Sequence, residues 1–227
     1  HIYNTFSQLS QNIKNFPYSE ASIQALLCDA RSLKIESNTI DFVITSPPYI
    51  NVINYHQNYR YSAEILGWNL LKIAKSEIGS NRANRRNRFL TVIQYCLDMA
   101  CVIQELQRVC KPNARIIFVV GYESQVLGVP FYNAEIISEI ATKTNLFELV
   151  ISQKRIFKNK FGKFIREDLL NFSRNSSSLS VKEIDEIARK VAYQVLSQGL
   201  TFVSDKNKSS LIEAIEKIPY LGKSPLY

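Results

Sequence analysis

The apolar run from Ile116 to Val120 constrains the fold of this chain more than any other sequence feature. An uninterrupted run of this kind, rich in β-branched residues, is typical of a strand buried on both faces of a parallel sheet. It follows an amphipathic helical pattern that begins at Phe89 and ends before Pro112, and a shorter apolar run, 40–45, lies further upstream. The order strand, helix, strand predicts an α/β sheet with helices on both faces.

The remaining periodic segments extend this prediction to the rest of the chain. We expect a further buried strand at 25–30, helices at 63–74 and 133–144, and strands at 147–157 and 168–173. The last two strands, joined by the basic turn 158–163, predict a terminal antiparallel hairpin. After residue 174 a Ser-rich linker leads to Ser180 and Glu183, which have the spacing of a capping box. The sequence therefore predicts an α/β unit at 1–174 and a small C-terminal helical extension at 175–227.

Composition narrows the class of protein. With 227 residues, 46% apolar and 21% charged, the chain is long and apolar enough to bury a core. It has no apolar run long enough to span a membrane and no secretory leader, so we expect a cytoplasmic protein. Four Cys without a Cys-x-x-Cys pair and two His predict neither a disulfide framework nor a metal site. His1 in the first position suggests that these residues begin inside a longer polypeptide.

Two predicted strands end in residues that suit chemistry. Asp29 closes the first, and Ser46-Pro47-Pro48-Tyr49 closes the second, at the strand ends where open α/β sheets bind ligands. A Pro-Pro step has no N–H, so nearby carbonyls can accept hydrogen bonds from a ligand, and the aromatic ring offers a stacking face. An amino group on a flat base would satisfy both features. The alternative is that the prolines only end the strand and Tyr49 is a core residue.

The segment Thr45-Ser46-Pro47-Pro48-Tyr49 resembles the catalytic motif of the DNA amino-methyltransferases, which transfer a methyl group from S-adenosylmethionine to an exocyclic base nitrogen. Four further segments resemble the same family in the same order, and the resemblance spans about residues 20–175: Cys28–Arg31, Arg60–Trp68, Tyr95–Gly121 and Arg166–Arg174. The resemblance implies a Rossmann-like methyltransferase sheet.

The resemblance also implies roles for single residues. A flipped base would stack on Tyr49, while the Ser46 side chain and the Pro47 carbonyl accept hydrogen bonds from its amino group. Asp29 and Ala30 would contact the cofactor S-adenosyl-L-methionine. Ser in the first motif position favours the N4 amino group of cytosine. Alternatives are adenine N6, an amino group in RNA, and a catalytically incomplete DNA-binding subunit of a restriction-modification system.

One family feature is missing. No Gly-x-Gly pair occurs in the sequence, whereas the family uses a Gly-rich loop to hold the methionine part of the cofactor. We expect this loop to be encoded upstream or in a second chain, and we expect the 227 residues alone to bind the cofactor poorly.

Two basic sets suit contact with the phosphates of double-stranded DNA, since the chain carries a net charge of +8. The first set lies at 82–88, where a solvated loop is the alternative interpretation, and the second lies in the predicted hairpin; the residues are Arg82, Arg85, Arg86, Arg88, Lys158, Lys160 and Lys163.

Overall fold

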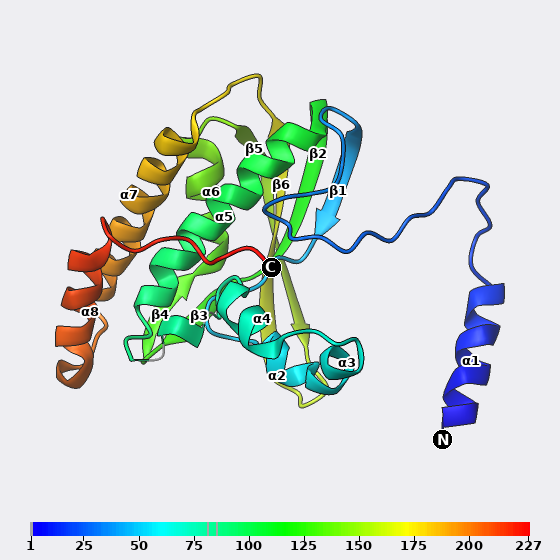
Figure 1. Cartoon of the computed structure of the whole chain (residues 1–227), viewed down its shortest axis with the longest axis horizontal. Helices are drawn as coiled ribbons and strands as arrows, with labels where there is room; N and C mark the ends of the chain where they lie inside the picture. The colour runs from blue at the N-terminus through cyan, green and yellow to red at the C-terminus, as the bar shows by residue number, and fades with distance from the viewer. Residues whose placement is uncertain (1, 81, 85) are drawn as a thin grey trace.

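The computed structural model describes residues 2–80, 82–84 and 86–227, and these residues build one main mixed sheet (Figure 1). Its strand order is β1-β2-β6-β5, with bounds β1 Ile40–Thr45, β2 Cys110–Gly121, β6 Phe164–Arg174 and β5 Phe147–Lys158. β1 pairs in parallel with β2, and the long helix α5 (Leu90–Val109) connects them. The predicted crossover unit is therefore confirmed, with the first strand at its predicted bounds.

The terminal hairpin is confirmed as well. β6 lies antiparallel to β2, and β5 lies antiparallel to β6, so β5 runs in the same direction as β1 and β2. The carboxyl ends of β1, β2 and β5 consequently lie at the same edge of the sheet. This edge carries the segment after β1 and the turn after β5.

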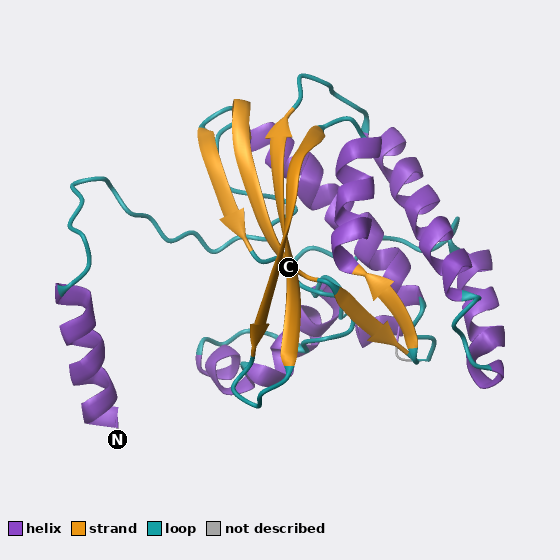
Figure 2. Cartoon of the chain, turned by 180° about the vertical axis from the view of Figure 1, so that it is seen from behind, coloured by secondary structure: helices purple, strands orange, loops and turns teal. Residues whose placement is uncertain are grey.

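Helices cover one face of the sheet in the described part of the chain (Figure 2). α5, α6 (Asn133–Lys143) and α7 (Val181–Gly199) pack together on this side, over the buried side chains of Ile116, Phe118 and Phe172. The Phe118 and Phe172 rings meet edge to face with their centroids 6.0 Å apart. The expectation of helices on both faces is wrong for these residues.

The opposite side, which we call the open face, carries side chains that alternate with the buried ones. Strand register places Phe42, Ile44, Ile117, Val119, Ile151 and Leu169 on it. Phe42, Ile44 and Ile151 are exposed and the other three are partly exposed. The same register places Arg115, Asn171, Gln153, Arg155 and Glu167 on this face, so in the described residues the open face is apolar mainly over β1 and β2 and has no covering layer.

The N-terminal region differs most from expectation. Residues 25–28 are coil, Leu26 and Leu27 are exposed, and Asp29 forms only an isolated bridge with Ser32, so the predicted strand at 25–30 is wrong. Upstream, α1 (Ile2–Lys14) projects away from the sheet on an extended linker, as Figures 1 and 2 both show.

Short elements fill the connections. The single helix expected at 63–74 is two helices, because Gly67 adopts a φ of +71° between them. The structure also contains a small hairpin that the sequence analysis missed, with Leu127 and Gly128 at positive φ in its turn. The bounds are α2 Tyr55–Asn58, α3 Arg60–Ile65, α4 Leu70–Ser76, the 3₁₀ turn η1 Arg82–Asn84, β3 Glu123–Val126 and β4 Val129–Tyr132.

The C-terminal extension is helical, as predicted. α7 begins with the expected capping box, in which Ser180 and Glu183 bond each other's backbone N–H groups. The second helix of the extension, α8 (Asp205–Lys217), packs on α7. None of the helices in the described residues is both long and apolar enough to cross a membrane.

Candidate active site

The Ser46 hydroxyl lies at the carboxyl end of β1, and its hydrogen-bond geometry makes it an acceptor. Ser46 Oγ donates to the Val119 carbonyl at 2.9 Å and lies 3.2 Å from the Tyr49 hydroxyl oxygen. A serine hydroxyl has one hydrogen, so the bond between the two hydroxyls must be donated by Tyr49. Ser46 is exposed and its oxygen retains a lone pair. It can therefore accept a hydrogen bond from an amino group.

Tyr49 lies in close contact with two glycines, Gly121 and Gly79. A Cβ at Gly121 would lie 2.8 Å from Tyr49 Cε2, and a Cβ at Gly79 would lie 2.8 Å from the Tyr49 carbonyl oxygen. Because any larger residue would displace Tyr49, Gly121 and Gly79 fix where the ring and its backbone sit. The ring stays half-buried, so part of it is accessible for stacking, and the adjacent Pro47 is buried. Tyr49 is therefore not a fully buried core residue, which was the alternative interpretation.

Asn133 holds the motif against the end of β2. Its side chain is fully buried; Oδ1 accepts from the Ile50 N–H at 3.2 Å, and Nδ2 donates to the Gly121 carbonyl at 3.1 Å and to Ser124 Oγ at 2.8 Å. The sequence predicted a helix that starts at residue 133, and in the structure Tyr132 occupies the N-cap position of α6. A positioning role for Asn133 was missed because its partner Ile50 is 83 residues away.

A histidine–carboxylate pair lies close to this motif. His56 Nδ1 is 2.8 Å from Glu77 Oε2, and both side chains are buried. The neighbouring Tyr55 stacks on Tyr59 at 6.4 Å, and burial, followed by the charge of Tyr49, raises the pKa of Tyr55. Glu77 therefore holds the buried imidazole of His56 through Nδ1.

The predicted cofactor residue Asp29 is bound to Arg31. Arg31 Nε and the Arg31 backbone N–H each donate to Asp29 Oδ1 at 2.9 Å, and Arg31 Nη2 donates to Oδ2 at 2.7 Å. Burial alone would raise the pKa of Asp29, but the Arg31 hydrogen bonds outweigh it and lower the pKa. Ala30 is exposed beside this pair.

Arg31 also bonds groups from distant parts of the chain. Its guanidinium is buried and bonds Asp98 at 2.8 Å, as well as the Ser224 and Ser76 carbonyls. Asp98 is fully buried, and this burial raises its pKa although Arg31 opposes the shift. Arg31 therefore ties the N-terminal linker to α5 and to the C-terminal segment.

The basic hairpin turn lies at the same edge of the sheet as Ser46. Lys158 ends β5, and the ammonium groups of Lys158 and Lys160 lie 5.0 Å from the ring centroids of Phe164 and Phe161, respectively. Lys163 is also exposed. Among the described residues, no acidic side chain forms an ion pair with these lysines.

The first basic set, at 82–88, is divided between exposed and bonded side chains. Arg86 is exposed, whereas the Arg88 guanidinium donates to Asn51 Oδ1, two residues after Tyr49. Arg88 is thus part of the wall of the site. Arg85 and the side chain of Arg82 lie outside the described residues.

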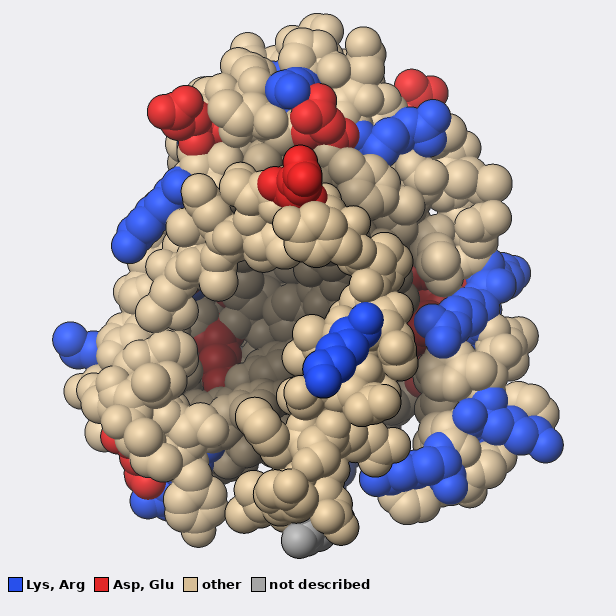
Figure 3. All heavy atoms as spheres, turned by 90° about the vertical axis from the view of Figure 1, so that its right-hand side faces the viewer, with Lys and Arg blue, Asp and Glu red and all other residues tan. Residues whose placement is uncertain are grey.

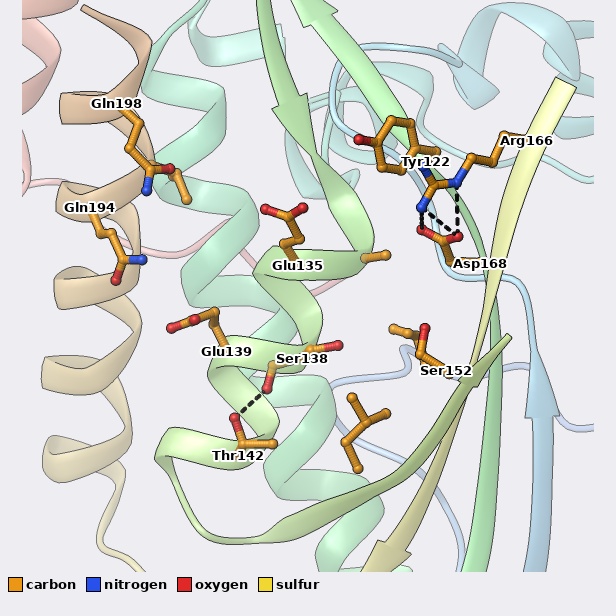
Figure 4. Close-up of a pocket in the computed structure, with 14 residues that line it drawn as sticks. Tyr122, Glu135, Ser138, Glu139, Thr142, Ser152, Arg166, Asp168, Gln194 and Gln198 are labelled. Carbon is orange, nitrogen blue, oxygen red and sulfur yellow. Dashed lines mark hydrogen bonds and ion pairs between the residues drawn. The ribbon is translucent and has the colours of Figure 1, made fainter. Parts of the chain in front are cut away.

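A separate pocket lies on the helix-covered side of the sheet (Figure 4). It has a volume of about 450 Å³ and is lined from α6, α7 and β6, with the ion pair between Arg166 and Asp168 at one end. Arg166 also lies 3.5 Å above the Tyr122 ring. Asp168 pairs with Val120 on the covered face, whereas the Tyr49 ring lies where a Gly121 side chain would point, on the open face. The pocket and the motif are on opposite sides of the sheet.

Comparison with known proteins adds distant similarities. No protein-family model matches the chain. The type II methyltransferase M.BsoBI of Geobacillus stearothermophilus is 23% identical, with 73% of this chain covered. The chain spans 45% of that relative's length.

Two solved structures overlap in part. A SAM-dependent methyltransferase of Methanosarcina mazei has a TM-score of 0.42 at 12% identity and covers 74% of this chain and 76% of its own. A putative DNA modification methylase of Thermus thermophilus has a TM-score of 0.37 at 16% identity and covers 68% and 55%. Both structural overlaps are too weak to carry an argument. The comparisons therefore establish only a distant similarity in sequence to a methyltransferase.

Proposed function

We propose that this chain carries the base-binding half of an S-adenosylmethionine-dependent methyltransferase that modifies the N4 amino group of cytosine in DNA. The observation that carries the proposal is the Ser46 hydroxyl, whose hydrogen is used by Val119 and whose oxygen faces outward beside the Tyr49 ring. The distant similarity to M.BsoBI, a type II methyltransferase, supports methyl transfer as the reaction.

The site would recognise a flipped base through two of its features. The Tyr49 ring stacks on the base, and Ser46 Oγ accepts a hydrogen bond from the amino group, with the Pro47 carbonyl as the expected second acceptor. Two acceptors on an amino group fix its rotation and so orient the nitrogen for reaction. Gly121 and Asn133 hold this arrangement in place.

The described residues do not form a complete cofactor site. The carboxylate of Asp29 is occupied by Arg31, and the sequence has no Gly-x-Gly pair. When bound, S-adenosylmethionine would supply the electrophilic methyl group. We propose that a polypeptide segment outside these residues completes its site, and we derive no step through the cofactor.

DNA contact is proposed for the hairpin turn. The hairpin turn with Lys158, Lys160 and Lys163 projects beyond the edge of the sheet that carries Ser46, because Ser152 is level with Thr45 and Lys158 comes six residues later. A phosphate backbone that lies along the hairpin would lead toward the motif. Phe161 and Phe164 are exposed between them and offer apolar contacts.

The test is methyl uptake by unmethylated DNA from labelled S-adenosylmethionine, using the chain together with the proteins that co-purify with it. Tyr49→Ala removes the stacking face, worth about 1–3 kcal/mol, and should lower uptake roughly ten- to hundredfold. Tyr193→Ala is the matched control, because Tyr193 is an exposed tyrosine on α7. Equal uptake by Tyr49→Ala and wild type would overturn the assigned role of Tyr49.

A second candidate function is a DNA-binding subunit without transferase activity. The missing Gly-x-Gly pair and the open edge of β1 favour it. Salt-dependent DNA binding without methyl uptake, under the same conditions, would support this function against the first.

A further inference from the structure

The open face of the sheet carries an exposed apolar patch centred on β1 and β2, with the polar residues Arg115, Asn171 and Gln153 beside it. Phe42 is 53% exposed and Ile44 is 66% exposed, and the partly exposed Ile117, Val119 and Leu169 continue the surface across β2 and β6. Contiguous exposed apolar residues of this kind mark interaction sites. Parallel strands such as β1 are normally covered on both faces.

The helix α1 has the complementary property. Its residues Ile2, Phe6, Leu9 and Ile13 recur at the spacing of one helix face, and none of the helix's 13 residues is buried. A helix of this length is marginal in water without tertiary contacts. α1 therefore needs a surface for its apolar stripe, by which we mean these four residues.

We propose that α1 docks its apolar stripe onto the open face of its own sheet. The sizes match, since a 13-residue helix is about 20 Å long and four strands at about 4.8 Å spacing span roughly 14–19 Å. The docked helix would bury Phe6 and Leu9 against Ile44 and its neighbours.

The linker permits this docking. Arg31 is the first firm anchor of the chain after α1, and the intervening segment, about 16 residues, can reach roughly 50 Å. A flexible tether of that length gives an effective concentration in the millimolar range, which favours docking within one chain over exchange between two. The linker is exposed from Asn15 to Leu27, so no packing must be broken for it to move.

The surface chemistry fits an uncharged contact. Figure 3 views the side of the molecule that carries α1, and it shows a hollow that is mostly uncharged, with an acidic side chain inside it and both acidic and basic side chains around it. The only charged residue of α1 is Lys14, at its last position, and its apolar stripe has no charge to bury. Hydrophobic contact is then the main attraction.

Hydrogen–deuterium exchange of the full chain tests the docking. We expect the α1 amides to exchange at least about tenfold more slowly than an unstructured segment, equally at low and high protein concentration. Phe6→Asp should abolish this protection and speed exchange in β1. Gln8→Asp adds the same charge to the same helix away from the stripe and should retain protection. Neither residue is buried, so the body stays folded in both variants.

Three results would overturn the proposal. The first is wild-type α1 exchanging at the unstructured rate, and the second is equal protection in the two variants. The third is protection that rises with concentration together with dimer formation in sedimentation, because the occupant would then be a second copy. Each is read in protein without cofactor or DNA, so the test is independent of the proposed enzymatic activity.

Discussion

Replacing Gly121 by Ala should displace the Tyr49 ring. The new Cβ would lie 2.8 Å from Tyr49 Cε2 and 3.1 Å from Cδ2 and Cζ, whereas ordinary contact begins at 3.4 Å. The ring must therefore retreat by at least about 0.6 Å, and it would lose its bond with Ser46. Since a shift of about 1 Å in a reacting group can cost roughly 10²-fold in rate, we expect methyl transfer to fall about tenfold or more.

The same substitution should change stability. Overpacking costs about 1–3 kcal/mol, and the lower chain entropy of Ala returns about 0.5–1 kcal/mol. At the middle of these ranges the net loss is about 1.2 kcal/mol, which corresponds to a Tm lower by about 2–5 °C, measured by calorimetry. Gly222→Ala is the control, because no atom lies within 4 Å of its added Cβ. Wild-type melting and wild-type methyl uptake in Gly121→Ala would refute the packing argument.

Three further predictions concern other parts of the structure. Arg31→Met leaves the buried carboxylate of Asp98 without its cation, so urea unfolding should show a loss of about 3–5 kcal/mol; an unchanged midpoint would contradict this role. The hydrogen bond from Arg108 lowers the pKa of Glu105 in the folded protein. The stabilisation from this carboxylate is therefore complete above the ordinary carboxyl pKa and is lost as the pH falls through the lowered pKa. Glu105→Gln should flatten the pH dependence of the unfolding free energy between about pH 5 and 3, and parallel profiles for the variant and wild type would argue against this role. A triple variant, Lys158→Gln, Lys160→Gln and Lys163→Gln, removes three positive charges from the hairpin turn. The slope of the logarithm of the DNA-binding constant against the logarithm of the salt concentration should fall in magnitude by roughly 2–3, and an unchanged slope would mean that DNA binds elsewhere.

Local patterns predicted the elements whose contacts lie within one crossover or hairpin. β1 was predicted at its observed bounds because an apolar run directly before two prolines leaves a single place to stop. The capping box at Ser180 was likewise local. The run at 25–30 has the same apolar character as β1 but no neighbouring strand to pair with, so it remains coil.

The motif at 46–49 could be found from the sequence, but its support could not. Gly121 was recognised only as the end of a segment that resembles the family, and Asn133 only as the start of a predicted helix. Their roles depend on contacts with Tyr49 and Ile50, more than 70 residues away in the chain. Such distances are set by the tertiary fold, and helix or strand periodicity carries no information about them.

Mass spectrometry of nucleosides is the most direct test of the proposed activity. Unmethylated DNA would be incubated with S-adenosylmethionine and the chain, as purified and with its co-purifying proteins, then digested to nucleosides. We expect N4-methylcytosine among the nucleosides, and its loss in Ser46→Ala, which removes the proposed acceptor. N6-methyladenine instead would contradict the assigned base, and the absence of any methylated nucleoside would contradict the proposal that these residues belong to an amino-methyltransferase.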